Sequence, residues 1–169
     1  MRYAAPLLLS ILTLTGCPFP RVSGMIAPLG DLTIKQTDKI LSVGEVTGGE
    51  KTVILVSGPK IDNESFREAL TKTLEQSGLF KAVVRNKSGD YELNAQIISQ
   101  EVQIRGGYHA ILFVNYRLLD SRLNQEIWKE NILSQYDANS LELATGANEG
   151  AVRDNLTQLV KKLSQVLSR

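Results

Sequence analysis

The fold is decided by residues 91–136, which read YELNAQIISQEVQIRGGYHAILFVNYRLLDSRLNQEIWKENILSQY. Apolar and polar residues alternate from Tyr91 to Ile97, as they do in a half-buried strand. The apolar positions then shift by one residue, so we expect a β-bulge within residues 97–100. Gly106-Gly107 and residues 120–125 predict two turns. The stretch therefore predicts three consecutive strands joined by turns, which is typical of an antiparallel sheet.

The second and third of these strands each have one apolar face. In the second strand, every other residue is apolar: Ala110, Leu112, Val114, Tyr116 and Leu118. In the third strand, the corresponding residues are Trp128, Ile132 and Tyr136. We expect these residues to fill the core and the cross-strand pairs of the sheet.

Three further short strands are predicted upstream. Residues 40–46 and 52–57 are β-rich runs on either side of Gly48-Gly49, so we expect them to form a hairpin. Residues 80–86 are a short segment of mixed character that precedes the long strands. With the three long strands, these segments bring the number of predicted strands to six.

Two amphipathic helices are predicted around these strands. Residues 63–77 carry apolar residues at helical spacing, after an N-cap at Asp62 or Asn63 and before Gly78. Residues 147–167 show a second helical stripe. Its central members are Leu156, Leu159 and Leu163. We expect this stripe to be buried against the sheet face that includes Leu112, Val114 and Tyr116.

The predicted element order is β-β-α-β-β-β-β-α. Two helices with one apolar face each can cover one face of a largely antiparallel sheet. We therefore predict an α+β two-layer sandwich, with residues 39–169 forming a single periplasmic domain.

The N-terminus reads MRYAAPLLLSILTLTGC and has the pattern of a lipoprotein signal peptide. A short apolar stretch over residues 7–14 follows Arg2 and is too short to span a bilayer, which needs about 20 apolar residues. Leu14-Thr15-Gly16-Cys17 resembles the lipobox of bacterial lipoproteins. We expect cleavage between Gly16 and Cys17, and a diacylglyceryl and acyl-modified Cys17. A buried core cysteine is the less favoured alternative.

The lipid chains are the expected membrane anchor. Loss of residues 1–16 removes only Arg2 among the charged residues, so 18 cations remain beside 18 anions and attraction to anionic lipids cannot be the main tether. Each buried CH₂ contributes about 0.8 kcal/mol, and stable anchoring takes more than one chain. Residue 18 is Pro and not the Asp linked to inner-membrane retention in enteric bacteria, which favours the outer membrane.

Residues 17–38 are predicted to form the lipidated N-terminus and a tether. Prolines and glycines punctuate the stretch, so we expect neither a helix nor a central strand there. Two alternatives stay open. The segment is either a spacer that lifts the domain off the membrane or an arm that packs on the domain through apolar residues such as Met25 and Leu29.

Composition excludes several function classes. The 169 residues include 19 Lys+Arg, 18 Asp+Glu, one Cys and one His, so a basic nucleic-acid binder and an intramolecular disulfide framework are excluded. His109 follows a turn, and the sequence contains no G-x-S-x-G motif whose serine it could activate. We therefore predict no catalytic residues, metal ligands or cofactors, and no nucleic-acid partner.

A resemblance supports the same compartment. The relevant stretches are FREAL (66–70), SGLF (77–80), YELNA (91–95), VNYRL (114–118), IW (127–128) and ANEGAVRDNL (147–156). Their layout resembles poorly characterised proteobacterial envelope lipoproteins and, more distantly, the auxiliary lipoproteins of ABC-type lipid transporters. Residues 147–155 are either a recognition patch or a polar helix start, and we favour the helix start.

We expect a non-catalytic, membrane-anchored lipoprotein that binds an envelope protein partner in assembly or transport, for instance by adding a strand to a sheet edge. The alternative is a lipid- or small-ligand-binding auxiliary component of an ABC-type transporter, which would need an apolar pocket between the two layers. A hydrolase is a third class, which would require a catalytic dyad in the folded chain.

Overall fold

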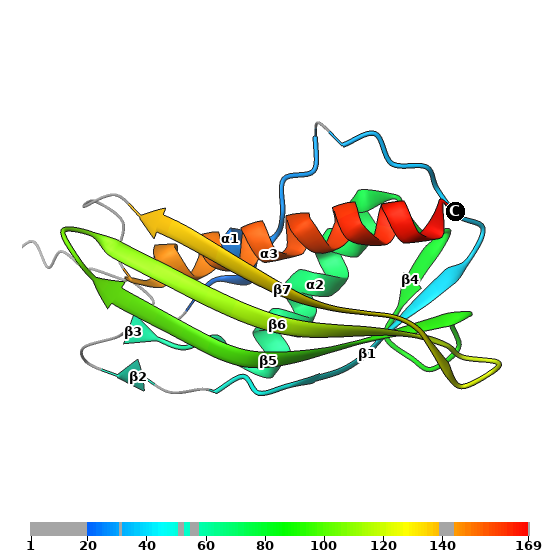
Figure 1. The fold of residues 1–169 in the computed structure, drawn as a ribbon, viewed down its shortest axis with the longest axis horizontal. Coiled ribbons are helices and arrows are strands. Elements are labelled where there is room, and N and C mark those ends of the chain that lie inside the picture. The colour runs from blue at the N-terminus through cyan, green and yellow to red at the C-terminus, as the bar shows by residue number, and fades with distance from the viewer. Residues whose placement is uncertain (1–19, 31, 51–52, 55–57, 139–143, 169) are drawn as a thin grey trace, which may run out of the picture.

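The computed structural model describes residues 20–30, 32–50, 53–54, 58–138 and 144–168. The elements in chain order are α1 (Val22–Met25), β1 (Ile40–Thr47), β2 (Val53–Ile54), β3 (Gly58–Pro59), α2 (Asn63–Ser77), β4 (Ala82–Val84), β5 (Tyr91–Ile104), β6 (Tyr108–Asp120), β7 (Gln125–Ala138) and α3 (Ala144–Leu167). Five strands form one sheet in the order β4-β1-β5-β6-β7, and α2 and α3 cover one of its faces (Figure 1). The predicted α+β two-layer fold is confirmed.

The strands β5, β6 and β7 form the long antiparallel part of the sheet, as the sequence predicts. The register between β5 and β6 shifts between Ile97 and Ser99, which confirms the predicted bulge. Gly106 turns the chain with φ 73°, and the Arg105 amide donates to the Gly107 carbonyl at 3.0 Å. These strands extend past the helices at one end of the molecule (Figure 1).

The predicted hairpin between residues 40–46 and 52–57 is wrong. β1 runs parallel to both of its neighbours, β4 and β5, while β2 pairs with β3 in a separate ladder. Gly48 has φ 80°, and a Cβ there would overlap the carbonyl of Ile97. The Gly49 amide donates to the Asn63 side chain at 2.7 Å. The glycine pair therefore leads the chain past the sheet towards the start of α2 and does not turn it back onto β1.

Helix α2 has the predicted bounds and caps. The Asp62 carboxylate accepts from the amides of Glu64 and Ser65, each at 3.0 Å, and satisfies two amides of the first turn. Gly78 ends the helix in the left-handed conformation with φ 62°. The buried face of the helix, which includes Phe66, packs against β1 and β4.

Helix α3 begins at Ala144, three residues before the predicted start, and packs against β6 and β7. Leu156, Leu159 and Leu163 are fully buried, as predicted. Gly150 lies against the ring of Tyr136, where a Cβ would overlap the ring. The absence of a side chain at this position therefore lets the helix approach the sheet closely.

A buried polar network joins α3 to the inner face of the sheet. The Tyr116 hydroxyl donates to Asn155 Oδ1 at 2.7 Å, and Asn155 Nδ2 donates to the Ile132 carbonyl at 3.0 Å and to Ser134 Oγ at 3.2 Å. Ser134 Oγ in turn donates to the Ala151 carbonyl at 2.9 Å. Burial raises the pKa of the Tyr116 phenol well above its ordinary value of 10.0, so the hydroxyl stays a donor. The network fixes one register of α3 on β6 and β7.

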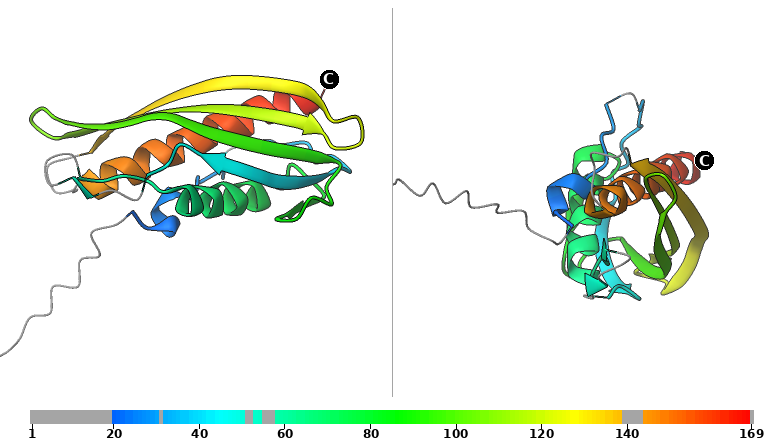
Figure 2. Two further views of the ribbon diagram at one scale, coloured as in Figure 1. Left: turned by 90° about the horizontal axis from the view of Figure 1, so that it is seen from below. Right: turned by 90° about the vertical axis from the view of Figure 1, so that its left-hand side faces the viewer.

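The described part of the N-terminal segment packs on the domain. Met25 and Ala27 are fully buried in the core, and Leu29 packs against it. One helical turn, α1, forms where no helix was expected. It contacts α3 and α2 and lies on the helical side of the molecule, away from the long strands (Figure 2).

Candidate functional site

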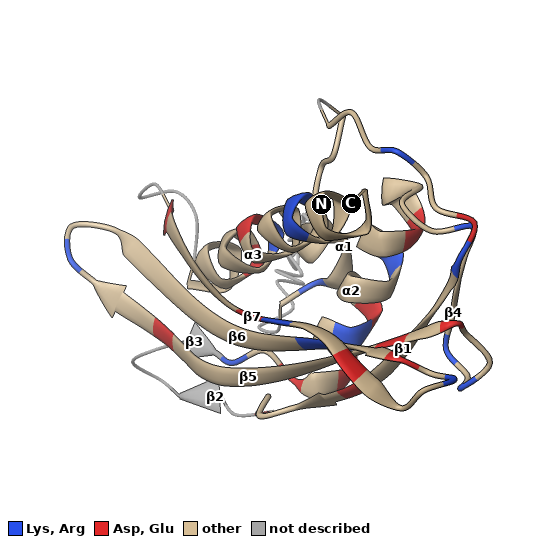
Figure 3. Cartoon of the chain, turned by 45° about the vertical axis from the view of Figure 1, so that its right-hand side comes forward, with Lys and Arg blue, Asp and Glu red and all other residues tan. Residues whose placement is uncertain are grey.

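A polar hollow of about 500 Å³ opens over β1. It is lined by residues of β1, β5 and β6, by one side chain of α2 and by the segment that follows β4. Its charged members are Arg67, Arg85, Lys87, Arg117, Glu45 and Glu92. Basic and acidic residues are likewise interspersed over the strands and helices (Figure 3).

An irregularity in β1 shapes the floor of this hollow. The pairing of β1 with β5 shifts between Val43 and Val46, and the freed amide of Glu45 donates to Asn94 Oδ1 at 2.6 Å. From α2, Arg67 donates through Nη2 to the Val43 carbonyl at 3.1 Å. The Nε of Arg67 is buried and has no hydrogen-bond partner among the described residues.

The charges around the hollow are partly neutralised by neighbours. Arg117 Nε lies 2.6 Å from Glu126 Oε2. The pKa of Glu68 on α2 is lowered, mainly by its hydrogen bond and ion pair with Lys72 and to a smaller degree by Arg85. The hollow is thus open, polar and of mixed charge, which suits a polar group in contact with water better than a lipid chain.

The outer face of the sheet carries a separate apolar patch, which we define as Ile98, Ile111, Phe113 and Leu133. Phe113 pairs directly with Leu133 and with Ser99, and Ile98 is the extra residue of the β5 bulge. The exposed fraction is 49% for Ile98 and 52% for Leu133, and Ile111 and Phe113 are half-buried. The described residues place both helices on the opposite face, so this outer apolar patch faces solvent.

His109 forms an exposed pair with Asp137 at the far end of the same face. His109 Nδ1 lies 2.6 Å from Asp137 Oδ1, and Nε2 lies 3.1 Å from the Arg105 carbonyl. The hydrogen bond to Asp137, then that to Arg105, raises the pKa of His109 above 6.5. Both ring nitrogens face acceptors. The described residues that line the adjacent hollow include no Ser, Thr or Cys.

Comparison with known families identifies the chain. Residues 51–167 match the family LptE, described as lipopolysaccharide-assembly. The chain belongs to this family. Among curated proteins, none matches it in sequence. The LptE match supports the expected envelope setting, and it supplies no link to an ABC-type transporter.

Solved structures share the fold of this LptE-family chain. A Xanthomonas campestris protein of the family DUF330 has a TM-score of 0.65 at 17% identity, over 89% of this chain and 95% of that one. A hypothetical protein from Chlamydia trachomatis has a TM-score of 0.61 at 14% identity, over 79% of this chain and all of that one. At these identities the likeness concerns the fold alone.

The predicted lipidation site, Gly16-Cys17, lies outside the described residues. No helix among the described residues of this LptE-family chain is long and apolar enough to cross a membrane. No cluster of three or more potential metal-ligating side chains occurs in the described part of the chain either. In the stretch 147–155, Arg153 and Asp154 are half-buried and the other seven residues are buried, so the stretch is no exposed recognition patch. The favoured alternative, a polar helix start, is also wrong, because α3 begins at Ala144 and the stretch lies inside the helix.

Sequence reasoning missed both surface features of this family member. The outer apolar patch had a local signal, because residues 110–114 are all apolar, which breaks the alternation expected of a half-buried strand. The hollow over β1 had no such local signal in the sequence. Its residues come from segments that meet only when β1 is inserted between β4 and β5.

Proposed function

We propose that this LptE-family chain is a lipid-anchored, non-catalytic protein that binds an envelope protein partner during lipopolysaccharide assembly. The outer apolar patch carries the proposal. Apolar side chains of β5, β6 and β7 are exposed or half-buried on this face, while those of the inner face are buried. The helices leave the outer face of the sheet open (Figure 2). Exposed apolar side chains ringed by polar ones are typical of a protein interaction site.

The outer face is a better binding site than the edge of the sheet. The edge strand β7 lies beside α3, whose Asn155 and Gln158 side chains donate to the carbonyls of Ile132 and Leu133. The other edge strand, β4, has only three residues. Strand addition would therefore have little free edge among the described residues.

The alternative of a lipid-binding auxiliary protein receives less support. The described hollow over β1 is open and polar, and the layers between sheet and helices are filled by one continuous cluster of buried side chains. A site for acyl chains needs an apolar cavity. We therefore favour a protein partner.

The proposed anchor is the acylated Cys17, which holds the chain at the periplasmic face of the outer membrane. Pro18 after the cysteine and the lipopolysaccharide-assembly family support this location. Labelled palmitate should enter the natural chain, and Cys17→Ser should give an unprocessed or poorly processed precursor. Equal labelling of Cys17→Ser would overturn the anchor.

Site-specific photocrosslinking in cells tests the binding face. A photoreactive residue at Leu133 should give an adduct with an envelope protein, whereas one at Gln76, exposed on α2, should give none. Leu133→Glu should abolish the adduct and lower the lipopolysaccharide content of the outer membrane, and Gln76→Glu should do neither. Equal crosslinking at both positions would contradict the proposal.

A further inference from the structure

The hollow over β1 lies on the same face of the sheet as the outer apolar patch. Asn115 and Arg117 of the hollow follow Phe113 of the patch at alternate positions of β6, and alternate residues of a strand point to one face. Asn115 pairs with Gln96 of β5, which also lines the hollow. Four residue steps along a strand cover about 14 Å, which separates Phe113 from Arg117. A standard interface buries about 800 Å² on each protein, so one partner of ordinary size reaches both the patch and the hollow.

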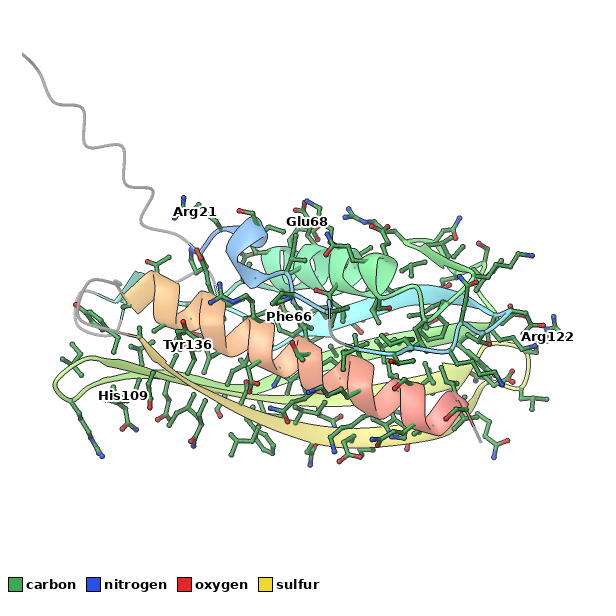
Figure 4. The ribbon with its side chains drawn as sticks, turned by 90° about the horizontal axis from the view of Figure 1, so that it is seen from above. Arg21, Phe66, Glu68, His109, Arg122 and Tyr136 are labelled. Atoms are coloured by element: carbon green, nitrogen blue, oxygen red, sulfur yellow. The ribbon has the colours of Figure 1, made fainter. Side chains whose placement is uncertain are left out.

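Arg67 brings a guanidinium with unused hydrogen-bond donors to the hollow. It lies on α2 between Phe66, which points into the core, and Glu68, which points away from it (Figure 4). A guanidinium has five N–H donors. Among the described residues, the Val43 carbonyl accepts from Nη2 at 3.1 Å, Nε is buried without a partner, and no ion pair includes Arg67. An acceptor that enters the hollow would therefore find donors that the folded chain does not satisfy.

Two further cations are held at the hollow by the segment that follows β4. Ser42 of β1 fixes this segment, because its Oγ donates to the Asn86 carbonyl at 2.7 Å and accepts from the Gly89 amide at 2.8 Å. Ser42 is buried, with 2% of its surface exposed. The segment carries Arg85 and Lys87, which line the hollow. These two cations are thus attached to a backbone that is anchored on β1.

The acidic side chains of the hollow restrict the charge of the group that it can bind. Four cations and two carboxylates, Glu45 and Glu92, line it. One of the cations, Arg117, is already paired with Glu126 at 2.6 Å. A phosphomonoester carries nearly two negative charges at neutral pH and would be repelled by both lining carboxylates. A side-chain carboxylate carries one charge and two acceptor oxygens, and it matches the guanidinium of Arg67.

We propose that the hollow over β1 binds an aspartate or glutamate side chain of the same protein partner that covers the outer apolar patch, with Arg67 as the main donor. This inference rests on the proposed function. Burial of the patch supplies affinity, and the directional hydrogen bonds between guanidinium and carboxylate fix how the partner lies on the sheet. The partner therefore carries apolar side chains and, about 14 Å away along β6, an acidic one.

Site-specific photocrosslinking in cells tests whether the partner covers the hollow. A photoreactive residue at Gln96, an exposed residue that lines the hollow, should give an adduct with the same protein as one at Leu133. Gln76, exposed on α2, is the control position and should give no adduct. The absence of an adduct at Gln96, or an adduct there with a different protein or with a membrane lipid, would overturn the proposal.

Asn94→Asp adds a negative charge inside the hollow and retains a backbone contact. The Oδ1 atom of Asn94 accepts from the Glu45 amide at 2.6 Å, and an aspartate can accept the same bond. The added carboxylate repels the acid of the partner, so the yield of the adduct at Leu133 should fall roughly tenfold. Asn131→Asp is the matched control, because Asn131 lies on the outer face beside Asn115 but does not line the hollow. It should change the yield by no more than about twofold.

Arg67→Met removes the guanidinium and keeps an unbranched side chain. The adduct at Leu133 should again fall roughly tenfold, because a hydrogen-bonded charge pair is lost. The matched control is Lys72→Met on the same helix. Lys72 is paired with Glu68 at 2.7 Å and does not line the hollow, so this variant should keep the adduct. Melting curves of both variants show whether a loss of adduct comes from unfolding.

A double-mutant cycle with the crosslinked partner separates binding by Arg67 from a purely structural role. Each Asp or Glu of the crosslinked segment is changed to Asn or Gln, and the affinity of the purified partner for the full, acylated chain is measured. One of these changes should weaken the complex by the same factor as Arg67→Met, and the two changes together should weaken it no further. Losses that multiply for every acid tested would overturn the proposal.

The outcomes distinguish this site from the proposed function. A protein adduct at Leu133 that survives both Arg67→Met and Asn94→Asp would overturn the carboxylate site and leave the partner-binding face intact. If Arg67→Met fails to fold, Asn94→Asp alone decides. The absence of any adduct at Leu133 in the natural chain would contradict the proposed function, and the carboxylate site with it.

Discussion

The two faces of β6 and β7 both carry apolar side chains, yet they differ in what covers them. On the inner face, Tyr116 and Ile132 are 0% and 1% exposed beneath α3. On the outer face, Leu133 is 52% exposed, although it is the next residue along the strand. The inner face differs because a helix supplies both an apolar stripe and the Asn155 side chain that satisfies the Tyr116 hydroxyl. Apolar character alone therefore does not decide which face becomes the core; a complementary element must cover it.

The largest effect is expected from a charge in the stripe that covers the inner face. Leu159 is fully buried, and loss of a buried leucine alone costs about 2–5 kcal/mol. An unpaired carboxylate adds a desolvation penalty, and a typical domain has a margin of about 5–15 kcal/mol. Leu159→Asp should abolish the folding transition of residues 18–169 in a melting curve. Lys161→Glu, on the exposed side of α3, should melt like the natural chain.

Alanine substitutions at two adjacent residues of β7, one on each face of the sheet, compare the contributions of the two faces to stability most directly. Ile132→Ala opens a cavity under α3 and should lower the free energy of unfolding by about 2–5 kcal/mol. Leu133→Ala removes an exposed side chain and should change it by no more than about 0.5 kcal/mol. Urea unfolding of both variants measures the two changes in the free energy of unfolding. Similar losses would mean that the outer apolar patch contributes to the core, against the partner-binding proposal.

A smaller effect is expected at the polar link between α3 and the sheet. Tyr116→Phe removes the hydroxyl that donates to Asn155 Oδ1 and leaves that oxygen buried without its donor. The free energy of unfolding should fall by about 1–3 kcal/mol. Tyr108→Phe is the matched control, because Tyr108 is half-buried at the other end of the strand. Equal melting temperatures for the two variants would show that the network adds no stability.

The smallest effect is a pH dependence on the outer face. In the folded protein, hydrogen bonds to the Asp137 side chain and to the Arg105 carbonyl raise the pKa of His109. The positive charge of the Arg105 side chain lowers this pKa to a smaller degree. Gln103, the residue paired with His109 on β5, carries no charge. The contribution of the His109–Asp137 pair is therefore fully present below pH 6.5, the ordinary pKa, and is lost as pH rises through the raised folded pKa. Asp137→Asn should bring the NMR titration midpoint of His109 back towards 6.5. An unchanged midpoint would show that Asp137 is not the cause.

Parts of this fold were predictable because their signals are local. The caps of α2, Asp62 and Gly78, act within one helical turn, and the bulge after Ile97 changes the alternation of adjacent residues. The predicted hairpin at Gly48-Gly49 failed, because a glycine pair permits several turns of the chain and the sequence does not show which strand becomes the neighbour. The hollow over β1 depended on that same neighbour, so its residues could not be brought together from sequence.

The sequence by itself determined the periodic features of this protein: the buried stripes of α2 and α3 and the inner faces of β5 to β7. These follow from side-chain spacing within one element. Only the tertiary structure decided that β1 lies between β4 and β5, that residues 21–27 are held by hydrogen bonds to Glu149 and Arg153, and that Phe113 and Leu133 remain uncovered. The reason is physical: these outcomes depend on contacts between residues as far as 129 positions apart, which no local pattern encodes.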